Sequence, residues 1–339
     1  MSSPAVPLSR ATPINWARFV EIVESHERFL LTSHIRPDCD ALGSELGMAG
    51  VLESLDKQVL IVNGQPTPPN LQFIDPDRRI KALGVDVQAK DLEEVEVLMV
   101  LDTGAWAQLG PMADIVKSTR ARKILLDHHV DADELGAELF KNTRAEATGR
   151  LVAEAAAQLR VPLTPEIARP LFAAVATDTG WFRFGSTTGD TLRLAGQLMD
   201  AGADPVAIYA DLYERDSLAR LQLRGRILSR TKNELNGRLV YTAALKEDFT
   251  ATGALASDTE DVINLTLAIA GTEVAVIFVE QASGGFKLSF RSRVPHVNCN
   301  ELARQFGGGG HKAAAGAFIN EPFEAAQSKV LDAVRKAMR

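Results

Sequence analysis

The chain contains only two cysteines and no long hydrophobic run, and these two features argue against several classes of protein. Cys39 and Cys299 are far apart and neither belongs to a Cys-x-x-Cys motif, so we expect neither a disulfide framework nor a thiolate zinc site. No stretch of about 18 apolar residues occurs, and the first residues lack an apolar run flanked by basic ones. We therefore expect a cytoplasmic protein without membrane contact.

Aromatic residues and positive charge are also scarce. Aromatics make up 6% of the 339 residues, which does not favour extensive stacking on nucleic-acid bases. The formal net charge of −7 argues against a protein that coats nucleic acid, because backbone binding requires a basic surface. The acidic excess is uneven, however. Between Gly285 and Arg339, nine Lys and Arg residues oppose four acids, a net charge of +5 that leaves −12 for the rest.

This division of charge suits a phosphate-bearing substrate, with an acidic front that could hold metals and a basic rear that could hold an anion. Solvated helix faces would produce the same tally, so the charge pattern alone does not decide between the two interpretations.

The length and the pattern of apolar segments predict two domains of the α/β class. The chain is too long for one typical core, and its 46% apolar and 24% charged residues are ordinary for a globular protein. Strand-like and helix-like segments alternate through the front of the chain, which predicts a mostly parallel sheet flanked by helices. The predicted strands end at 33, 101 and 126, and the predicted helices span 41–55, 149–159 and 165–176.

The rear of the chain has a different pattern, which predicts a smaller α+β domain. Residues 204–235 are charge-rich without a strand signal, and we interpret them as a helical connector. The predicted strands then span 238–245, 273–280 and 286–293, and the predicted helices 258–270, 300–306 and 321–338. We expect a disordered N-terminus (1–14), a catalytic domain (15–203), the connector and a substrate-binding domain (236–339), with the active site in the cleft between the two domains.

Acidic residues and histidines follow the predicted strands. Because ligands bind outside the carboxyl ends of strands in an open α/β sheet, residues distant in sequence should converge on one crevice. Carboxylates and imidazoles are the ligands that Mn²⁺ and Mg²⁺ accept, and two such ions about 3.5–4 Å apart can clamp the reacting oxygens of a phosphoryl transfer. The candidate ligands are His34, Asp38, Asp40, Asp102, Asp127, His128, His129 and Asp178.

The triplet Asp127-His128-His129 is the most specific of these signals. Adjacent histidines at a strand end point in different directions, so one can bind metal while the other faces substrate, and the aspartate can orient an imidazole. Taken alone, His34-x-x-x-Asp38-x-Asp40 would fit a helix cap with a surface carboxylate, and Asp178 would fit a helix C-terminal turn. Their occurrence together favours a site for two divalent ions.

The motifs resemble those of the DHH/DHHA1 phosphoesterases. More closely, His34-x-Arg-Pro-Asp-x-Asp-Ala-x-Gly-Ser44, Thr177-Asp-Thr-Gly-Trp-Phe-Arg-Phe184 and Phe306-Gly-Gly-Gly-Gly-His-Lys-Ala-Ala-Ala-Gly316 resemble the branch that degrades nanoRNA. The resemblance implies a DHH domain followed by a DHHA1 domain. It also implies a hydrolase that cuts short oligoribonucleotides to mononucleotides and removes the 3′-phosphate of 3′-phosphoadenosine 5′-phosphate, with water activated by two divalent ions. Mn²⁺ is the ion expected first, with Mg²⁺ or Co²⁺ as alternatives.

The resemblance also implies a role for each candidate residue. It assigns His34 and Asp38 to one metal, assigns Asp40, His128 and Asp178 to the other, and makes Asp102 the bridge. It implies that His129 meets the scissile phosphate while Asp127 holds the histidine pair in place. Cys39 departs from the family pattern, which usually has glycine there, and we expect a small buried side chain at that position.

The glycine run before His311 is the most unusual feature of the rear domain. Glycines let backbone N–H groups approach a phosphate, and His311 can add a hydrogen bond or a charge. The run is not a P-loop because Gly-Lys-Ser/Thr is missing, and its apolar flanks favour an ordered turn over a flexible linker. Arg291 and Arg293 alternate on a predicted strand, and the resemblance favours Arg291 as the phosphate ligand. The predicted substrate-binding residues are thus Arg291, Gly308, Gly309, Gly310 and His311.

The expected partners are short single-stranded RNA or DNA oligonucleotides and nucleotides with a terminal phosphate, and a homodimer is compatible with the sequence. Trp181, Phe182 and Phe184 could offer a stacking platform, but we expect them to pack in the core. Four alternatives use the same fold: a cyclic-di-AMP or linear dinucleotide phosphodiesterase, a RecJ-like exonuclease, a pyrophosphatase, and a non-catalytic nucleotide-binding regulator. The intact ligand set argues against the regulator.

Overall fold

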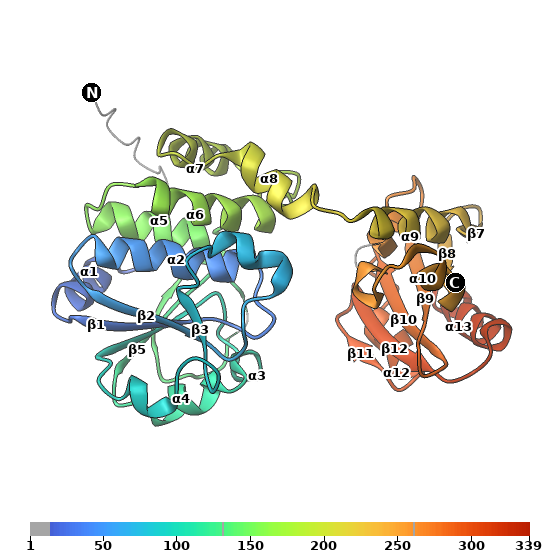
Figure 1. The fold of residues 1–339 in the computed structure, drawn as a ribbon, viewed down its shortest axis with the longest axis horizontal. Helices are drawn as coiled ribbons and strands as arrows, with labels where there is room; N and C mark the ends of the chain where they lie inside the picture. Colours follow the sequence, from blue (N-terminus) through green and yellow to red (C-terminus); the bar gives the residue numbers. More distant parts are fainter. Residues whose placement is uncertain (1–13, 131, 260–261) are drawn as a thin grey trace. The chain divides into compact units, whose positions relative to one another are not determined.

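The computed structural model describes residues 14–130, 132–259 and 262–339, which fall into two compact units, 1–215 and 216–339 (Figure 1). The N-terminal segment expected to be disordered lies outside the described residues as far as residue 13, whereas Ile14 is buried. Among the described residues, none of the helices is both long and apolar enough to cross a bilayer.

The first unit is built on a six-stranded parallel sheet of order β3-β2-β1-β4-β5-β6. The central strands β1, β4 and β5 are almost continuously apolar and buried, as expected for parallel strands that are covered on both faces. The chain direction across the sheet reverses between β1 and β4, which is the switch point where such folds bind ligands. The strands are β1 Arg28–Thr32, β2 Gln58–Asn63, β3 Ile80–Ala82, β4 Val97–Leu101, β5 Arg122–Asp127 and β6 Glu138–Lys141.

Helices cover both faces of this sheet. Alternating side chains of the central strands pack on one face against α1, α2, α5 and α6, and on the other against α3 and α4 (Figure 1). These helices confirm the predicted α/β class. They are α1 Trp16–Glu24, α2 Cys39–Glu53, α3 Trp106–Leu109, α4 Met112–Ser118, α5 Thr148–Gln158, α6 Pro165–Asp178, α7 Gly189–Asp200 and α8 Pro205–Tyr213, with 3-10 turns η1 Pro69–Ile74 and η2 Ala89–Leu92.

Helix α2 packs unusually closely against α6 through a face of glycines. A methyl group on Gly43 would lie 2.3 Å from the carbonyl oxygen of Pro170, and one on Gly47 would lie 2.4 Å from a methyl carbon of Leu171. Glycines four residues apart share one helix face, so these positions let the two helices approach until backbone meets backbone. The start of α2 therefore lies beside the end of α6.

The second unit is a six-stranded mixed sheet of order β11-β12-β10-β9-β8-β7, in which only β8 and β9 pair in parallel. Helices α12 and α13 cover one face, and α9 and α11 cover the other. This confirms the predicted α+β domain. Its elements are α9 Leu218–Ser229, β7 Lys232–Glu234, β8 Leu239–Ala244, α10 Lys246–Thr252, η3 Ala256–Thr259, α11 Val262–Leu267, β9 Val274–Glu280, β10 Phe286–Ser292, α12 Cys299–Arg304, β11 Gly309–Gly310, β12 Ala314–Ile319 and α13 Phe323–Ala337.

The prediction of a purely helical connector over 204–235 is wrong. Helix α8 ends at Tyr213, α9 begins at Leu218, and Lys232–Glu234 form the edge strand β7 of the second sheet. A short, charged edge strand has no alternating apolar pattern, so the sequence did not reveal it. The helix predicted over 258–270 is also shorter, since α11 ends at Leu267 and residues 260–261 lie outside the described chain.

Candidate metal centre

The six predicted metal ligands come together at the carboxyl edge of the first sheet. His34 and Asp38 lie in the loop after β1, Asp40 lies in the first turn of α2, and Asp102 follows β4. His128 follows β5, and Asp178 ends α6. Their side-chain ligand atoms form two groups in which all atoms lie within 4.8 Å of one another: His34, Asp38 and Asp102, and Asp40, His128 and Asp178.

Asp102 connects the two groups. Its Oδ2 is 3.4 Å from Nε2 of His34, and its Oδ1 is 3.6 Å from Nε2 of His128. One oxygen therefore faces each group, which is the arrangement that a bridging carboxylate needs. The residue adopts a left-handed backbone with φ 62°, a conformation that costs on the order of 1–3 kcal/mol outside glycine. A hydrogen bond from its N–H to the carbonyl of Leu126 (3.1 Å) holds this turn.

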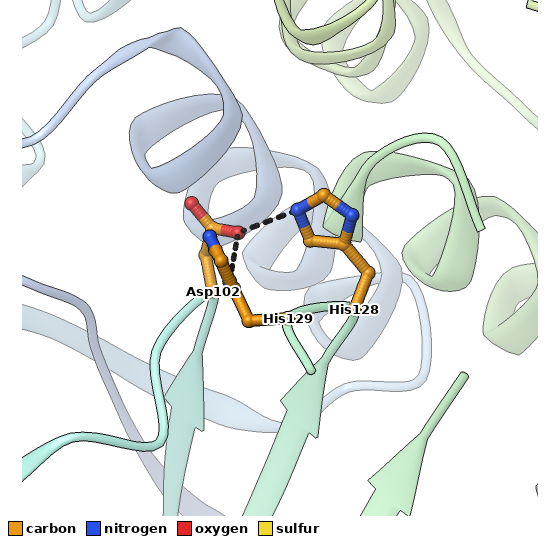
Figure 2. A group of neighbouring side chains, drawn as sticks. All are labelled: Asp102, His128 and His129. Atoms are coloured by element: carbon orange, nitrogen blue, oxygen red, sulfur yellow. Dashed lines mark ion pairs between the residues drawn. The ribbon is translucent and has the colours of Figure 1, made fainter. Parts of the chain in front are cut away.

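The rings of the two adjacent histidines both approach Oδ1 of Asp102, with Nε2 of His128 at 3.6 Å and Nδ1 of His129 at 3.7 Å (Figure 2). This differs from the prediction that the two side chains point in different directions. His128 lies with Nε2 at 3.7 Å from Asp40 and 3.5 Å from Asp178. Its Nδ1 is 3.2 Å from the carbonyl oxygen of Ala145. Because a carbonyl only accepts, Nδ1 donates there, and Nε2 faces the carboxylates.

His129 is held by Asp127 instead. Its half-exposed ring places Nδ1 2.8 Å from Oδ1 of Asp127, and the same oxygen accepts the His129 backbone N–H at 3.1 Å. The expectation that Asp127 holds both histidines is therefore wrong, since the Ala145 carbonyl orients His128. Nδ1 of His129 also lies 3.7 Å from Asp102. The ring therefore lies beside the metal ligands while it keeps its hydrogen bond to Asp127.

The buried carboxylates lie in an environment that disfavours their ionised forms, and a bound cation would reduce that cost. Asp40 and Asp102 are almost fully buried. Burial, followed by the charges of neighbouring carboxylates, holds the pKa of both well above the usual range, and burial also raises the pKa of Asp178. Divalent ions bound here would offset both the burial cost and the mutual repulsion, so the donor set fits a metal centre.

Asp127 and His129 form a hydrogen-bonded pair in which both pKa shifts favour the charged forms, unlike those of the buried carboxylates. Burial opposes ionisation of Asp127, but the hydrogen bonds from the ring and backbone of His129 outweigh it and lower the pKa of Asp127. Nζ of Lys141 lies 3.6 Å from the second oxygen of Asp127. The bond to Asp127 in turn raises the pKa of His129, against the effect of its partial burial. This pair favours an ionised Asp127 beside a protonated His129.

Two residues that the sequence did not single out contact the site directly. The Thr148 hydroxyl donates to Oδ1 of Asp102 (2.9 Å). The backbone N–H groups of Thr148 and Gly149 donate to the two oxygens of Asp40 (2.7 and 2.8 Å). The only signal was that Gly149 begins a predicted helix and Thr148 comes directly before it. Nothing in their spacing connects them to an aspartate 108 positions earlier.

The remaining positions near the centre are structural. Cys39 is buried at the start of α2, and burial raises the pKa of its thiol to about 12, so the side chain is a small neutral group, as expected. Trp181 packs edge-on against Phe172, and Phe182 does the same, which fits the expected core packing. Phe184 differs, because it is 55% exposed.

In the second unit, Arg291 and His311 both neighbour Ala314 at the start of β12. Arg291 in β10 pairs with Ala314 in β12, and the backbones of His311 and Ala314 exchange hydrogen bonds of 2.7 and 3.2 Å. The Arg291 guanidinium donates to the Phe290 carbonyl (3.1 Å). Within the described chain, neither Arg291 nor His311 forms an ion pair with an acidic side chain, so both side chains are available to an anion.

The glycine run has a structural role that the sequence did not reveal. The N–H of Gly308 donates to the Ala303 carbonyl (2.9 Å), and that of Gly310 donates to the Asn300 side chain (3.2 Å). A methyl group on Gly308 would lie 2.1 Å from the Gly316 carbonyl oxygen. These glycines let β11 approach β12, and their N–H groups already have partners. The ordered turn is confirmed, but the structure does not favour a phosphate cradle made by these two N–H groups.

Comparison with known proteins places this chain in a family. A model of the N-terminal domain of the DHH family matches residues 28–175, and a model of the DHHA1 domain matches residues 236–339. A bifunctional oligoribonuclease and PAP phosphatase, NrnA, of Thermus thermophilus is 31% identical over 314 residues, which cover 91% of this chain and 89% of that protein. The chain belongs to the DHH family.

Other members of the DHH family share most of the chain. NrnA of Bacillus subtilis, described by the same name, is 28% identical over 305 residues, covering 88% of this chain and 92% of that protein. The crystal structure of an exopolyphosphatase-related protein from Bacteroides fragilis superposes with a TM-score of 0.85 at 26% identity, covering 97% of each chain. The first unit carries the DHH match and the second unit carries the DHHA1 match.

Proposed function

We propose that the protein is a metal-dependent phosphoesterase that hydrolyses short oligoribonucleotides to mononucleotides and removes the 3′-phosphate of 3′-phosphoadenosine 5′-phosphate. The observation that carries the proposal is the position of Asp102, which offers one oxygen to the His34 group and the other to the His128 group. The relatives named for both activities cover about nine-tenths of the chain, which supports the choice of substrates.

Two divalent ions fit the ligand set, with Mn²⁺ proposed first and Mg²⁺ or Co²⁺ as alternatives. His34, Asp38 and Asp102 would hold one ion. The other would be held by Asp40, Asp102, His128 and Asp178. When bound, such ions supply Lewis-acid activation of water and neutralise charge on the phosphate. Two divalent ions balance the four carboxylates of the site, so the loaded site would not repel an anionic substrate.

Within this scheme His129 acts on the substrate directly. Its Nδ1 is engaged by Asp127, so the outer ring nitrogen Nε2 is the atom that remains for the scissile phosphate. The raised pKa of His129 favours the protonated ring, which can hold a phosphate oxygen or give a proton to the leaving oxygen. Asp127 fixes the ring in place, and Lys141 lies behind Asp127.

The second unit reads the end of the substrate. We propose that the side chains of Arg291 and His311 bind its terminal phosphate, with the unobstructed Gly309 beside them, rather than the N–H groups of Gly308 and Gly310. The arginine fork matches a terminal phosphate in two hydrogen bonds. Contacts to phosphate read little base identity, which suits short oligonucleotides of any sequence. The cytoplasmic location and the homodimer remain predictions.

A turnover panel tests the function. The substrates are end-labelled di- to heptanucleotide RNAs, 3′-phosphoadenosine 5′-phosphate and a cyclic dinucleotide, each assayed with Mn²⁺, Mg²⁺ or Co²⁺. We expect mononucleotides from the RNAs and inorganic phosphate from 3′-phosphoadenosine 5′-phosphate, with Mn²⁺ the most effective ion. Turnover of the cyclic dinucleotide alone would support the alternative phosphodiesterase. Metal binding without turnover of any substrate would support a non-catalytic regulator.

A further inference from the structure

The N-terminus of helix α5 has no cap of its own. The residue before it, Ala147, makes no side-chain hydrogen bond to the helix, although the first N–H groups of any helix need acceptors from outside. Asp40 supplies both acceptors from a distant part of the chain, since its Oδ2 accepts from the N–H of Thr148 (2.7 Å) and its Oδ1 from that of Gly149 (2.8 Å). Asp40 is thus a remote cap for α5.

Thr148 contacts a second carboxylate at the same time. While its N–H holds Asp40, its hydroxyl donates to Oδ1 of Asp102 (2.9 Å). This is the Asp102 oxygen that lies 3.6 Å from Nε2 of His128. A single fully buried residue therefore sets the spacing between Asp40 and the bridging Asp102 on the His128 side of the site.

The start of α5 is packed tightly against both α6 and Asp40. A methyl group on Gly149 would lie 2.6 Å from Cβ of Ala174 in α6 and 3.4 Å from Oδ1 of Asp40. Helix α5 is therefore pressed between α6 and the carboxylate that caps it. Thr148 is fully buried, and its N–H and hydroxyl are both engaged by carboxylates, so it does not meet substrate.

We propose that Thr148 is the positioning residue of the second metal position, with its hydroxyl fixing the bridging oxygen of Asp102 and the start of α5 fixing Asp40. The inference rests on the proposed two-metal function and deepens it. The His34 side depends on other contacts, because Asp38 is oriented by the N–H groups of Asp40 and Ala41 at the start of α2. Loss of the Thr148 hydroxyl should therefore weaken the metal position beside His128 more than the one beside His34.

The test compares three variants of the full chain by titrating Mn²⁺ into the metal-free protein in a calorimeter. Thr148→Val keeps the shape and the backbone N–H but removes the hydroxyl. Thr148→Ala removes the hydroxyl without placing a methyl group against Asp102, and Thr148→Ser keeps the hydroxyl while losing the methyl group. We expect two Mn²⁺ positions in the wild type, and about 10- to 100-fold weaker binding at one of them in the valine and alanine variants. The serine variant should bind within about threefold of the wild type.

The same series separates positioning from packing. If Thr148 only filled space, the valine variant would bind Mn²⁺ like the wild type, the serine variant would bind more weakly, and the alanine variant, which has the smallest side chain, would lose the most. That result, or equal weakening in the serine and valine variants, would overturn the inference while leaving the two-metal proposal in place. A wild-type protein that binds no Mn²⁺ would overturn the proposed function, and this inference with it. The Mn²⁺ concentration that half-saturates hydrolysis should rise in parallel with the calorimetric constant.

Discussion

Asp102 shows how much of the site depends on the conformation of a single residue. Its left-handed backbone turns the chain at the end of β4, so that one carboxylate oxygen faces His34 and the other faces His128. Aspartate and asparagine tolerate this conformation better than other residues with a Cβ atom. Position 102 therefore requires both a residue that tolerates a left-handed backbone and a side chain with two charged oxygens. A substitution can remove the second property while it keeps the first.

Asp102→Asn should retain the fold and lose hydrolysis. Asparagine fits the left-handed turn but carries no charge to share between two cations, so we expect turnover of 3′-phosphoadenosine 5′-phosphate to fall by about a thousandfold or more. The assay uses excess Mn²⁺, and thermal unfolding of the metal-free protein is the control for folding. Activity within about tenfold of the wild type would contradict the bridging role.

The buried side chain of Glu45 should make the stability of the metal-free protein depend on pH. It is fully buried in α2, one of its oxygens accepts from the Asn63 side chain (2.9 Å), and burial raises its pKa from 4.5 to about 8. Between these values the folded protein keeps a proton that the unfolded chain has released. The free energy of unfolding must therefore fall as pH rises through this window. Asp40 and Asp102 act in the same direction, since their pKa values are also raised.

Glu45→Gln should reduce this loss of stability. The amide does not ionise, so the decrease in unfolding free energy with pH should become shallower by up to about 1.4 kcal/mol per pH unit. Urea unfolding of both metal-free proteins at several pH values between 4.5 and 8 measures the two slopes. Parallel curves for the two proteins would show that Glu45 ionises normally in the folded state.

At the scale of elements, the close packing of α2 on α6 determines the distance between Asp40 at the start of one helix and Asp178 at the end of the other. Gly43→Ala should force the helices apart, because the new methyl group would lie 2.3 Å from the Pro170 backbone oxygen. We expect a loss of about 1–3 kcal/mol in stability together with weaker Mn²⁺ binding. Denaturant unfolding and Mn²⁺ titration measure the two effects.

The matched control is Gly196→Ala in α7. A methyl group there meets no atom within 4 Å, so the substitution should stabilise the protein by up to about 1 kcal/mol and leave Mn²⁺ binding unchanged. If Gly43→Ala behaved like Gly196→Ala, the close approach of α2 to α6 would not control the metal centre.

The sequence was informative about elements wherever a local pattern carried the signal. The apolar runs before His34, Asp102 and Asp127 predicted three strands of a mostly parallel sheet, and convergence of the ligands at the carboxyl ends of the strands follows from that class of fold. Thr148 was missed because its partners are 46 and 108 residues away, and only tertiary packing brings them together. Gly308 and Gly310 were predicted to bind phosphate because a glycine run lets another group approach the backbone closely. The run does not reveal whether that group is an anion or a neighbouring strand.

At the scale of the whole molecule, the uneven charge of the chain has a structural counterpart. The acidic cluster lies in the first unit, while Arg291 and His311 lie in the second without acidic partners among the described residues. Metal binding and recognition of the substrate end should therefore be separable by mutation, since each depends on the side chains of a different unit.

Arg291→Ala should raise KM by about 10- to 100-fold for substrates with a terminal phosphate, through the loss of a charge-assisted hydrogen-bonded pair. The kcat for these substrates and the affinity for Mn²⁺ should change little. Steady-state kinetics on oligonucleotides with and without the terminal phosphate measure the effect, and Arg293→Ala, an exposed arginine two positions along, is the matched control. An equal rise in KM on both kinds of substrate would contradict the assignment of Arg291.

A crystal structure of the protein grown with manganese, with the ions located by their anomalous scattering, tests the central claim most directly. The account predicts two manganese peaks on either side of Asp102, one bound by His34 and Asp38 and the other by Asp40, His128 and Asp178. A single peak, no peak, or two ions that do not share Asp102 would contradict it.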